Sequence, residues 1–219
     1  SRERAITVSA NVAPGQSQAQ AVAAAESIAG QVLPDGYRAV LSGSSQTFKE
    51  SFASLGFIFW LGILAAYMVL ASQFNSYVHP LSVLTALPFS VSGALAALWL
   101  GNQSINIYSM IGIVLLMGIV KKNSILLVDF TNQMRAQGKD VPEALLEACP
   151  IRLRPILMTS LSTIAAAVPP ALAVGPGAEI RIPMAISVIG GVLVSTLFTL
   201  FVVPCVYLMF ARFERKKTF

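Results

Sequence analysis

Two adjacent lysines, Lys121 and Lys122, lie in the middle of a long apolar stretch of this 219-residue chain. A helix over 105–134 would place both near its centre. A cation at bilayer depth costs about 2.5–3.5 kcal/mol on insertion scales, so such a residue is retained where a partner compensates it or a mechanism uses it. In a membrane protein the pattern therefore indicates an ion or proton pathway.

The spacing of the charges on this helix limits which groups can pair. Lys122 and Asp129 are seven residues apart, so they share nearly one face but are separated by about 10 Å of helix rise. Each is expected to need a partner on another helix. Lys121 is rotated by about 100° from Lys122, so only one of the two can point in a given direction. The alternatives are lysines that snorkel or line a wet crevice without titrating, and a surface ion pair for Asp129.

A second polar pattern opens the next apolar segment. Arg152 and Thr159 are again seven residues apart and share a face. The arginine could instead be a positive-inside anchor, and the hydroxyl could bond to its own helix or join two helices. The lone histidine, His79, predicts an interfacial role and no metal site. Nucleotide motifs and catalytic triads are missing from the sequence, which predicts neither an enzyme nor a cofactor.

The composition predicts an integral membrane protein. Hydrophobic residues make up 55% of the chain and charged residues only 11%, against about 25% charged in soluble domains. The net charge is +5, but the basic residues gather in loops and in the C-terminal tail. That distribution favours contact with anionic lipid over nucleic acid. Cys149 and Cys205 are interpreted as packing residues.

Two regions are predicted, 1–50 and 51–219. The second is a membrane domain with five helical spans of about the length that a bilayer requires. Glycines in these spans are expected to let helices approach closely. The Asp140-to-Glu143 spacing predicts a capping box that opens a short separate helix before the fourth span. The predicted spans cover residues 53–71, 81–100, 105–134, 155–174 and 182–210.

Residues 1–50 predict a small β-α-β unit. The strands are expected at Ala5–Val12 and Tyr37–Ser42, on either side of a helix over Gln16–Val32. The unit is too small to bury a core alone, so we expect it to complete a sheet built by residues outside this chain. The whole chain is interpreted as a C-terminal piece of a longer protein.

Loop charges predict the orientation. Basic residues flank the loop between the third and fourth spans and fill the C-terminal tail, which places both on the cytoplasmic side. Five spans then place residues 1–50 outside, which in a Gram-negative cell is the periplasm. The cytoplasmic set is Arg135, Lys139, Arg152, Arg154, Arg212, Arg215, Lys216 and Lys217.

Two motifs resemble one family. Gly118–Phe130 (Gly-Ile-Val-Lys-Lys-Asn-Ser-Ile-Leu-Leu-Val-Asp-Phe) and Arg152–Ser160 (Arg-Leu-Arg-Pro-Ile-Leu-Met-Thr-Ser) resemble the tenth and eleventh membrane helices of resistance-nodulation-division (RND) efflux permeases. The branch that the motifs resemble most is the hydrophobe/amphiphile efflux permeases of Gram-negative bacteria. Leu70–Pro80 resembles the turn between the eighth and ninth helices, and residues 5–42 resemble the end of the periplasmic porter domain, an α+β subdomain.

The resemblance implies proton-driven export of drugs or other amphiphiles across the inner membrane. It implies a homotrimer with a periplasmic adaptor and an outer-membrane channel. It also implies a proton relay in which a lysine faces two aspartates of the fourth membrane helix. By motif, the relay lysine is Lys122, with Thr159 and Arg152 beside it, while Lys121 and Asp129 fit the motif without the relay role. The aspartates belong to an N-terminal half that this chain lacks, so the chain alone is not expected to transport.

Two other functions stay open. A metal-ion exporter of the same superfamily would be expected to show extra acidic or methionine sites in its spans. A membrane scaffold without transport would make Lys122 structural, and replacing it by methionine would leave function intact.

Overall fold

The structure is a computed structural model that describes residues 5–10, 18–34 and 36–211. Helix α1 (Gln18–Val32) precedes the bundle, and α2 (Ser44–Phe74) leads into it. The remaining helices are α3 (His79–Leu84), α4 (Ala86–Leu100), α5 (Ile107–Ala136), α6 (Val141–Ala171) and α7 (Ala178–Ala211). The predicted C-terminal tail cations, Arg212, Arg215, Lys216 and Lys217, lie outside the described residues.

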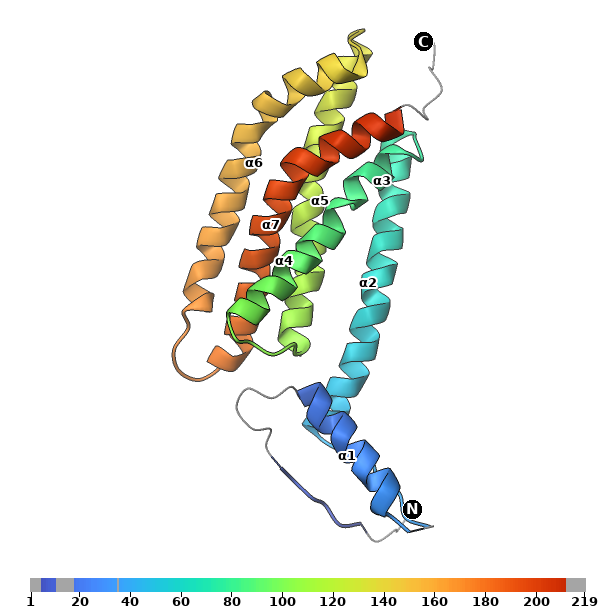
Figure 1. The fold of residues 1–219 in the computed structure, drawn as a ribbon, viewed down its shortest axis with the longest axis vertical. Helices are drawn as coiled ribbons and strands as arrows, with labels where there is room; N and C mark the ends of the chain where they lie inside the picture. Colours follow the sequence, from blue (N-terminus) through green and yellow to red (C-terminus); the bar gives the residue numbers. More distant parts are fainter. Residues whose placement is uncertain (1–4, 11–17, 35, 212–219) are drawn as a thin grey trace.

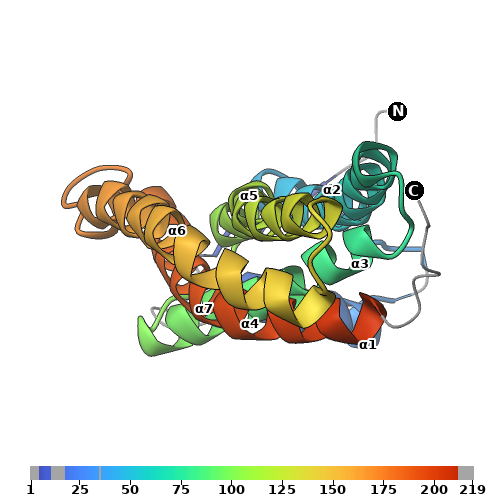
Figure 2. The same ribbon diagram turned by 90° about the horizontal axis from the view of Figure 1, so that it is seen from above.

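The five predicted spans are confirmed as five helices long and apolar enough to cross a membrane, with α3 and α4 forming one of them. Successive spans alternate in direction between the end of the bundle next to α1 and the end next to the C-terminus (Figure 1). We call these the α1 end and the C-terminal end. Helix α7 packs along α4, α5 and α6, whereas α2 reaches the bundle through α3 and α5. Both views place α2 and α6 at opposite edges (Figures 1 and 2).

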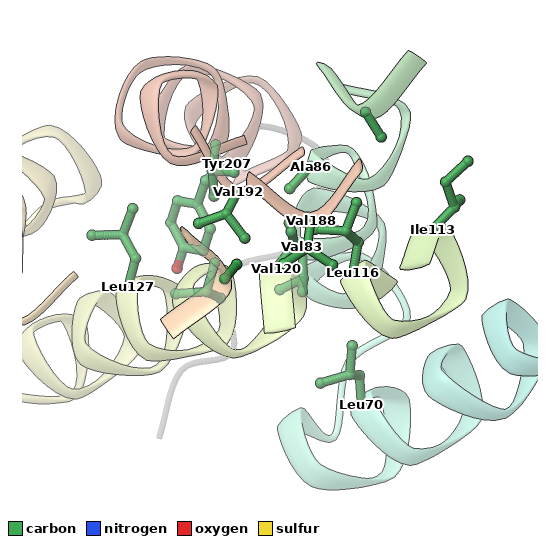
Figure 3. Packing of buried hydrophobic residues seen from close by; sticks show 14 of the residues in the cluster. Leu70, Val83, Ala86, Ile113, Leu116, Val120, Leu127, Val188, Val192 and Tyr207 are labelled. Carbon is green, nitrogen blue, oxygen red and sulfur yellow. The ribbon is translucent and has the colours of Figure 1, made fainter. Parts of the chain in front are cut away.

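The buried core lies between α4, α5 and α7 (Figure 3). Leu116 and Val120 of α5 are at most 2% exposed, as is Val192 of α7. Leu70 of α2 and Val83 of α3 extend the same cluster. Because large apolar side chains also cover the outside of the helices, the sequence shows little amphipathic contrast, as expected where lipid replaces water.

Three glycines explain how closely the spans approach one another. A Cβ on Gly190 would lie 2.1 Å from Cβ of Ala97 and 2.7 Å from the carbonyl oxygen of Gly93. A Cβ on Gly112 would lie 2.2 Å from Oγ of Ser187. A Cβ on Gly191 would meet Leu116 at 2.2 Å. The expectation of close glycine packing holds at these positions, whereas a Cβ on Gly56 or Gly118 would have no described neighbour within 4 Å.

The predicted β-α-β unit is wrong in the part of it that the structure describes. Its helix forms as α1, but residues 5–10 and 37–42 form no strand. Ile6 and Val8 are 94% and 88% exposed, and Tyr37 is 72% exposed. A strand needs a partner for its backbone hydrogen bonds, and the described residues offer none here. Residues 11–17, which include the end of the first predicted strand, lie outside the described ranges.

Two helix boundaries also differ from the prediction. The expected short helix after Asp140 and the fourth span are one continuous helix, α6, which bends near its start (Figure 1). Pro150 and Pro155 each remove a backbone donor, and this bends the helix without ending it. Asp140 is the N-cap residue, but its side chain accepts no capping hydrogen bond, so the predicted capping box with Glu143 is wrong.

The predicted second span is broken instead, at Thr85, between α3 and α4. Pro88 has no N–H to offer the carbonyl of Leu84, four residues earlier. The Thr85 hydroxyl donates to the carbonyl of Ser82 at 2.7 Å, which satisfies one of the acceptors at the end of α3.

Candidate functional site

The candidate site is built on the middle of α5. A capping box fixes where this helix begins: the Asn106 side chain accepts from the Ser109 backbone N–H at 2.8 Å, and the Asn106 N–H donates to Oγ of Ser109 at 2.9 Å. From that start the helix turns Val120 and Asn123 into the bundle. Lys122 lies between them in sequence but is exposed, and Lys121 is half-buried. The two lysines therefore face different surroundings, as their rotation predicts.

Asn123 joins the lysine motif of α5 to the threonine motif of α6. Its Nδ2 donates to Oγ of Ser160 at 3.2 Å, and its Oδ1 accepts from Oγ1 of Thr159 at 3.4 Å. The Thr159 hydroxyl also lies 3.0 Å from the carbonyl of Ile156 on its own helix. The two motifs thus meet in space through the residue next to Lys122.

Helix α7 completes this group. Oγ1 of Thr196 lies 2.8 Å from Oγ of Ser160 and 2.7 Å from the carbonyl of Val192. We call Asn123, Ser160 and Thr196 the polar triad; its members are 7%, 4% and 6% exposed. Hydrogen bonds between helices satisfy polar groups that the bilayer cannot, and they fix the rotation of each helix about its axis.

Arg152 lies on α6 toward the C-terminal end, above an aromatic ring. Its guanidinium carbon is 4.3 Å from the ring centre of Phe130 on α5, a cation–π distance. Its Nε is buried and has no hydrogen-bond partner among the described residues. Within the same ranges, no hydrogen bond joins Arg152 or Thr159 directly to Lys122. Arg152 and Thr159 each contact α5 at other residues, Phe130 and Asn123.

Asp129 lies two turns from Lys122 and is half-buried. Its Oδ2 accepts from Nε2 of Gln133 at 2.9 Å, one turn further along α5. This bond and the distance along the helix keep Asp129 apart from the lysines.

A second polar group, which residue type and spacing did not predict, lies at the C-terminal end. The hydroxyl of Tyr207, a residue only 1% exposed, donates to Oδ1 of Asn132 and accepts from Nη1 of Arg135, the latter at 2.9 Å. The Tyr207 ring stacks on His79, with centroids 5.2 Å apart and planes 8° from parallel. His79 is 5% exposed, so the expected interfacial histidine packs inside the end of the bundle.

Sequence reasoning selected Lys122, Thr159 and Arg152 but gave no role to Asn123, Ser160 or Thr196. Asn123 and Ser160 each adjoin a selected residue, so the motifs contained a signal for them. Thr196 had none, because an isolated threonine in an apolar span most often bonds to its own helix. In the described part of the chain, no three His, Cys, Asp or Glu side chains gather where they could hold a metal ion.

Known proteins resemble this chain over nearly its whole length. The model of the AcrB/AcrD/AcrF family matches residues 1–211. The multidrug resistance protein MdtC of Erwinia amylovora is 42% identical over 212 residues, which cover 96% of this chain and 21% of that protein. MdtC of Escherichia coli (strain UTI89 / UPEC) is 41% identical over 218 residues, 97% of this chain and again 21% of the relative. The chain thus spans about a fifth of the length of these relatives.

A solved structure is also similar. The crystal structure of a heavy metal efflux pump superposes with a TM-score of 0.78 and 25% identity, covering 89% of this chain and 20% of that one. By sequence and by fold, the chain belongs to the AcrB/AcrD/AcrF family of resistance-nodulation-division efflux transporters, which are membrane transporters and not enzymes.

Proposed function

We propose that this chain is the C-terminal part of a proton-driven antiporter that exports drugs or other amphiphilic compounds, with Lys122 in its proton relay. The observation that carries the proposal is the position of Lys122, an exposed cation in the middle of a span. An uncompensated cation there would be costly, which favours an acidic partner from outside these helices. The relay aspartates of an N-terminal half would supply it.

Thr159 and Arg152 are proposed to complete the relay on α6. Thr159 is held beside Asn123, the neighbour of Lys122, and Arg152 is held over Phe130. A protonated lysine between ionised carboxylates is compensated. When the carboxylates take up protons, that attraction weakens and α5 can shift against the helix that carries them. Lys121 and Asp129 are secondary candidates without the relay role.

The rest of the assembly follows from the family and is part of the proposal. The protein would lie in the inner membrane of a Gram-negative bacterium, with residues 1–50 in the periplasm and the C-terminus in the cytoplasm. Residues 1–50 would belong to the porter subdomain, residues 51–219 to the membrane domain. Three copies would work together with a periplasmic adaptor and an outer-membrane channel.

The test uses a full-length family member that carries this chain as its C-terminal part, here called the full-length permease. Export of a fluorescent amphiphile by cells is measured with and without an uncoupler that collapses the proton gradient. Lys122→Met is expected to reduce export to the level of the uncoupled cells while the permease still accumulates in the membrane. Uncoupler-sensitive export at the normal rate by Lys122→Met would reject the relay role and favour the scaffold alternative.

Metal export is the second candidate function, because the similar solved structure is named a heavy metal efflux pump. The MdtC relatives, at 41–42% identity, favour multidrug export instead. Growth of an efflux-deficient strain in a series of toxic metal salts and a series of dyes separates the two. Protection against metals alone would favour the metal exporter.

A further inference from the structure

Helix α7 reaches the lysine motif through the polar triad. The path runs from Nδ2 of Asn123 to Oγ of Ser160 at 3.2 Å, and from there to Oγ1 of Thr196 at 2.8 Å. It crosses from α5 through α6 to α7 in two hydrogen bonds. It begins one residue from Lys122 and therefore links a third helix to the proposed relay.

The bonds of Thr196 differ from those of four other serine and threonine hydroxyls in these spans. The hydroxyls of Ser90, Ser187 and Ser195 donate to carbonyls three residues earlier on their own helices, and Thr163 does so to the carbonyl four residues earlier. Such bonds satisfy a hydroxyl locally and connect nothing. Thr196 makes the local bond as well, to Val192 at 2.7 Å, and also reaches another helix.

The hydrogen bonds of the triad can all donate in the same direction, from α5 toward α7. A hydroxyl carries one hydrogen, so when Thr196 donates to the Val192 carbonyl, the hydrogen between the two hydroxyls comes from Ser160. Ser160 then accepts from Asn123, and the chain of donors runs from α5 to the backbone of α7. Each member of the triad then has a hydrogen-bond partner on a neighbouring helix, and removing one member leaves a buried polar group unpaired.

We propose that Ser160 and Thr196 are positioning residues of the proton relay, which they serve by fixing Asn123 and thereby the rotation of α5. This inference rests on the proposed function of Lys122. Asn123 is about 100° from Lys122 around the helix, so the rotation that the triad fixes also sets the direction of the lysine. Oδ1 of the same amide lies 3.4 Å from Oγ1 of Thr159, whose hydroxyl also lies 3.0 Å from the carbonyl of Ile156 on its own helix. Helix α7, which carries no relay charge, thus influences where Lys122 faces.

The charged groups near the triad are few. The charged residues within three turns of the triad on its own helices are Lys121, Lys122 and Asp129 of α5 and Arg152 and Arg154 of α6. Residues 182–211 of α7, 51–74 of α2 and 80–100 of α3 and α4 contain no charged side chain. A changed rotation of α5 would therefore alter chiefly how Lys122 meets acids from the N-terminal half. Because that encounter sets the pH at which the relay loads, a positioning defect moves the pH profile of export.

The experiment compares Thr196→Val with Thr163→Val in the full-length permease. Both changes replace a threonine by a residue of the same shape; Thr196 is buried and Thr163 is half-buried. The Thr163 hydroxyl bonds only within α6, to the carbonyl of Thr159 at 2.8 Å. Initial rates of dye export are measured over about three pH units around neutrality, from about pH 5.5 to about 8.5. Each rate is divided by the amount of permease in the membrane. Thr196→Ser is the conservative variant, and Lys122→Met is the reference for a lost relay.

The proposal predicts that Thr196→Val moves the midpoint of the pH profile by about half a unit or more. Thr163→Val should leave the midpoint at the value of the unchanged permease. Thr196→Ser, which keeps the hydroxyl, should do the same. An unmoved midpoint in Thr196→Val, or an equal shift in Thr163→Val, would overturn the positioning role. If Thr196→Val accumulates too poorly to assay, Ser160→Ala is measured by the same criterion. Normal export by Lys122→Met would instead reject the proposed function, so the two failures are distinguishable.

Discussion

The guanidinium of Arg152 on α6 lies over the ring of Phe130 on α5, 4.3 Å from its centre. The contact draws a cation from the start of the fourth span toward the helix that carries Lys122. It also explains how a half-buried arginine is accommodated with its Nε unpartnered among the described residues. An aromatic face offers a cation attraction without a hydrogen bond, and arginine stacks on it better than lysine does.

Replacing Phe130 by leucine should weaken this contact. We expect the free energy of unfolding to fall by about 0.5–2 kcal/mol, the range for a cation–π pair from exposed to desolvated sites. Thermal unfolding of the purified protein in detergent measures the change. Phe57→Leu is the control, because Phe57 is 69% exposed on α2. Equal losses in both variants would show that the Arg152 contact contributes nothing.

Replacing Gly190 by alanine should push α4 and α7 apart. The new Cβ would lie 2.1 Å from Cβ of Ala97 and 2.7 Å from the Gly93 carbonyl oxygen, and backbone cannot yield as a flexible side chain can. Overpacking of this kind costs about 1–3 kcal/mol or more. Gly118→Ala is the matched control on α5, where a Cβ meets no described atom within 4 Å. The midpoint temperature should drop for Gly190→Ala alone; a drop of the same size for Gly118→Ala would refute the close approach.

Replacing Tyr207 by phenylalanine should loosen the C-terminal end of the bundle. The change keeps the ring stacked on His79 but removes the bonds to Asn132 and Arg135. Two hydrogen bonds at about 0.5–1.5 kcal/mol each predict a loss of about 1–3 kcal/mol. Urea unfolding followed by tryptophan fluorescence measures it. Tyr77→Phe, at a site 79% exposed, should have no effect.

Removing either of two other buried hydroxyls should not destabilise the fold, in contrast to removing the hydroxyl of Tyr207. Ser124 and Thr199 are 0% and 1% exposed, and their hydroxyl oxygens have no hydrogen-bond partner in the described part of the chain. A buried polar group that pairs with nothing destabilises the fold, so its removal should be neutral or stabilising. Ser124→Ala should therefore keep or raise the midpoint temperature, whereas Ser160→Ala should lower it. A fall with Ser124→Ala as large as that with Ser160→Ala would show that the Ser124 hydroxyl has a partner.

The sequence predicted the membrane part of the fold better than the part before it. A predominantly apolar stretch of about twenty residues indicates a span whatever lies next to it, and all five stretches form helices long enough to cross a membrane. A strand such as the one expected at Tyr37–Ser42 depends on a partner strand, and none is present among the described residues. The predicted short helix after Asp140 and the span over 155–174 are instead one helix, α6, because Pro150 and Pro155 bend a helix in a packed bundle without ending it.

The candidate site divides in a similar way. Lys122, Arg152 and Thr159 could be selected from residue type and spacing, because an ionisable group inside a span is rare enough to be informative. The contacts of Asn123 with α6 and of Ser160 with Thr196 could not, since helical periodicity gives the face of a residue but not its neighbour on another helix. The capping residues show the same limit. The Asp140 side chain was expected to cap a helix, but it makes no capping bond at the start of α6. The side chain of Asn106, which was not expected to act as a cap, caps α5.

Proton flux through the membrane tests whether Lys122 takes part in proton transfer. The full-length permease is reconstituted in liposomes that contain a pH-sensitive dye, and proton movement is recorded when an amphiphilic substrate is added. We expect Lys122→Met to abolish substrate-driven proton flux while the protein stays folded and binds substrate, and Lys121→Met to retain most of it. Undiminished proton flux in Lys122→Met would show that Lys122 has no part in proton transfer.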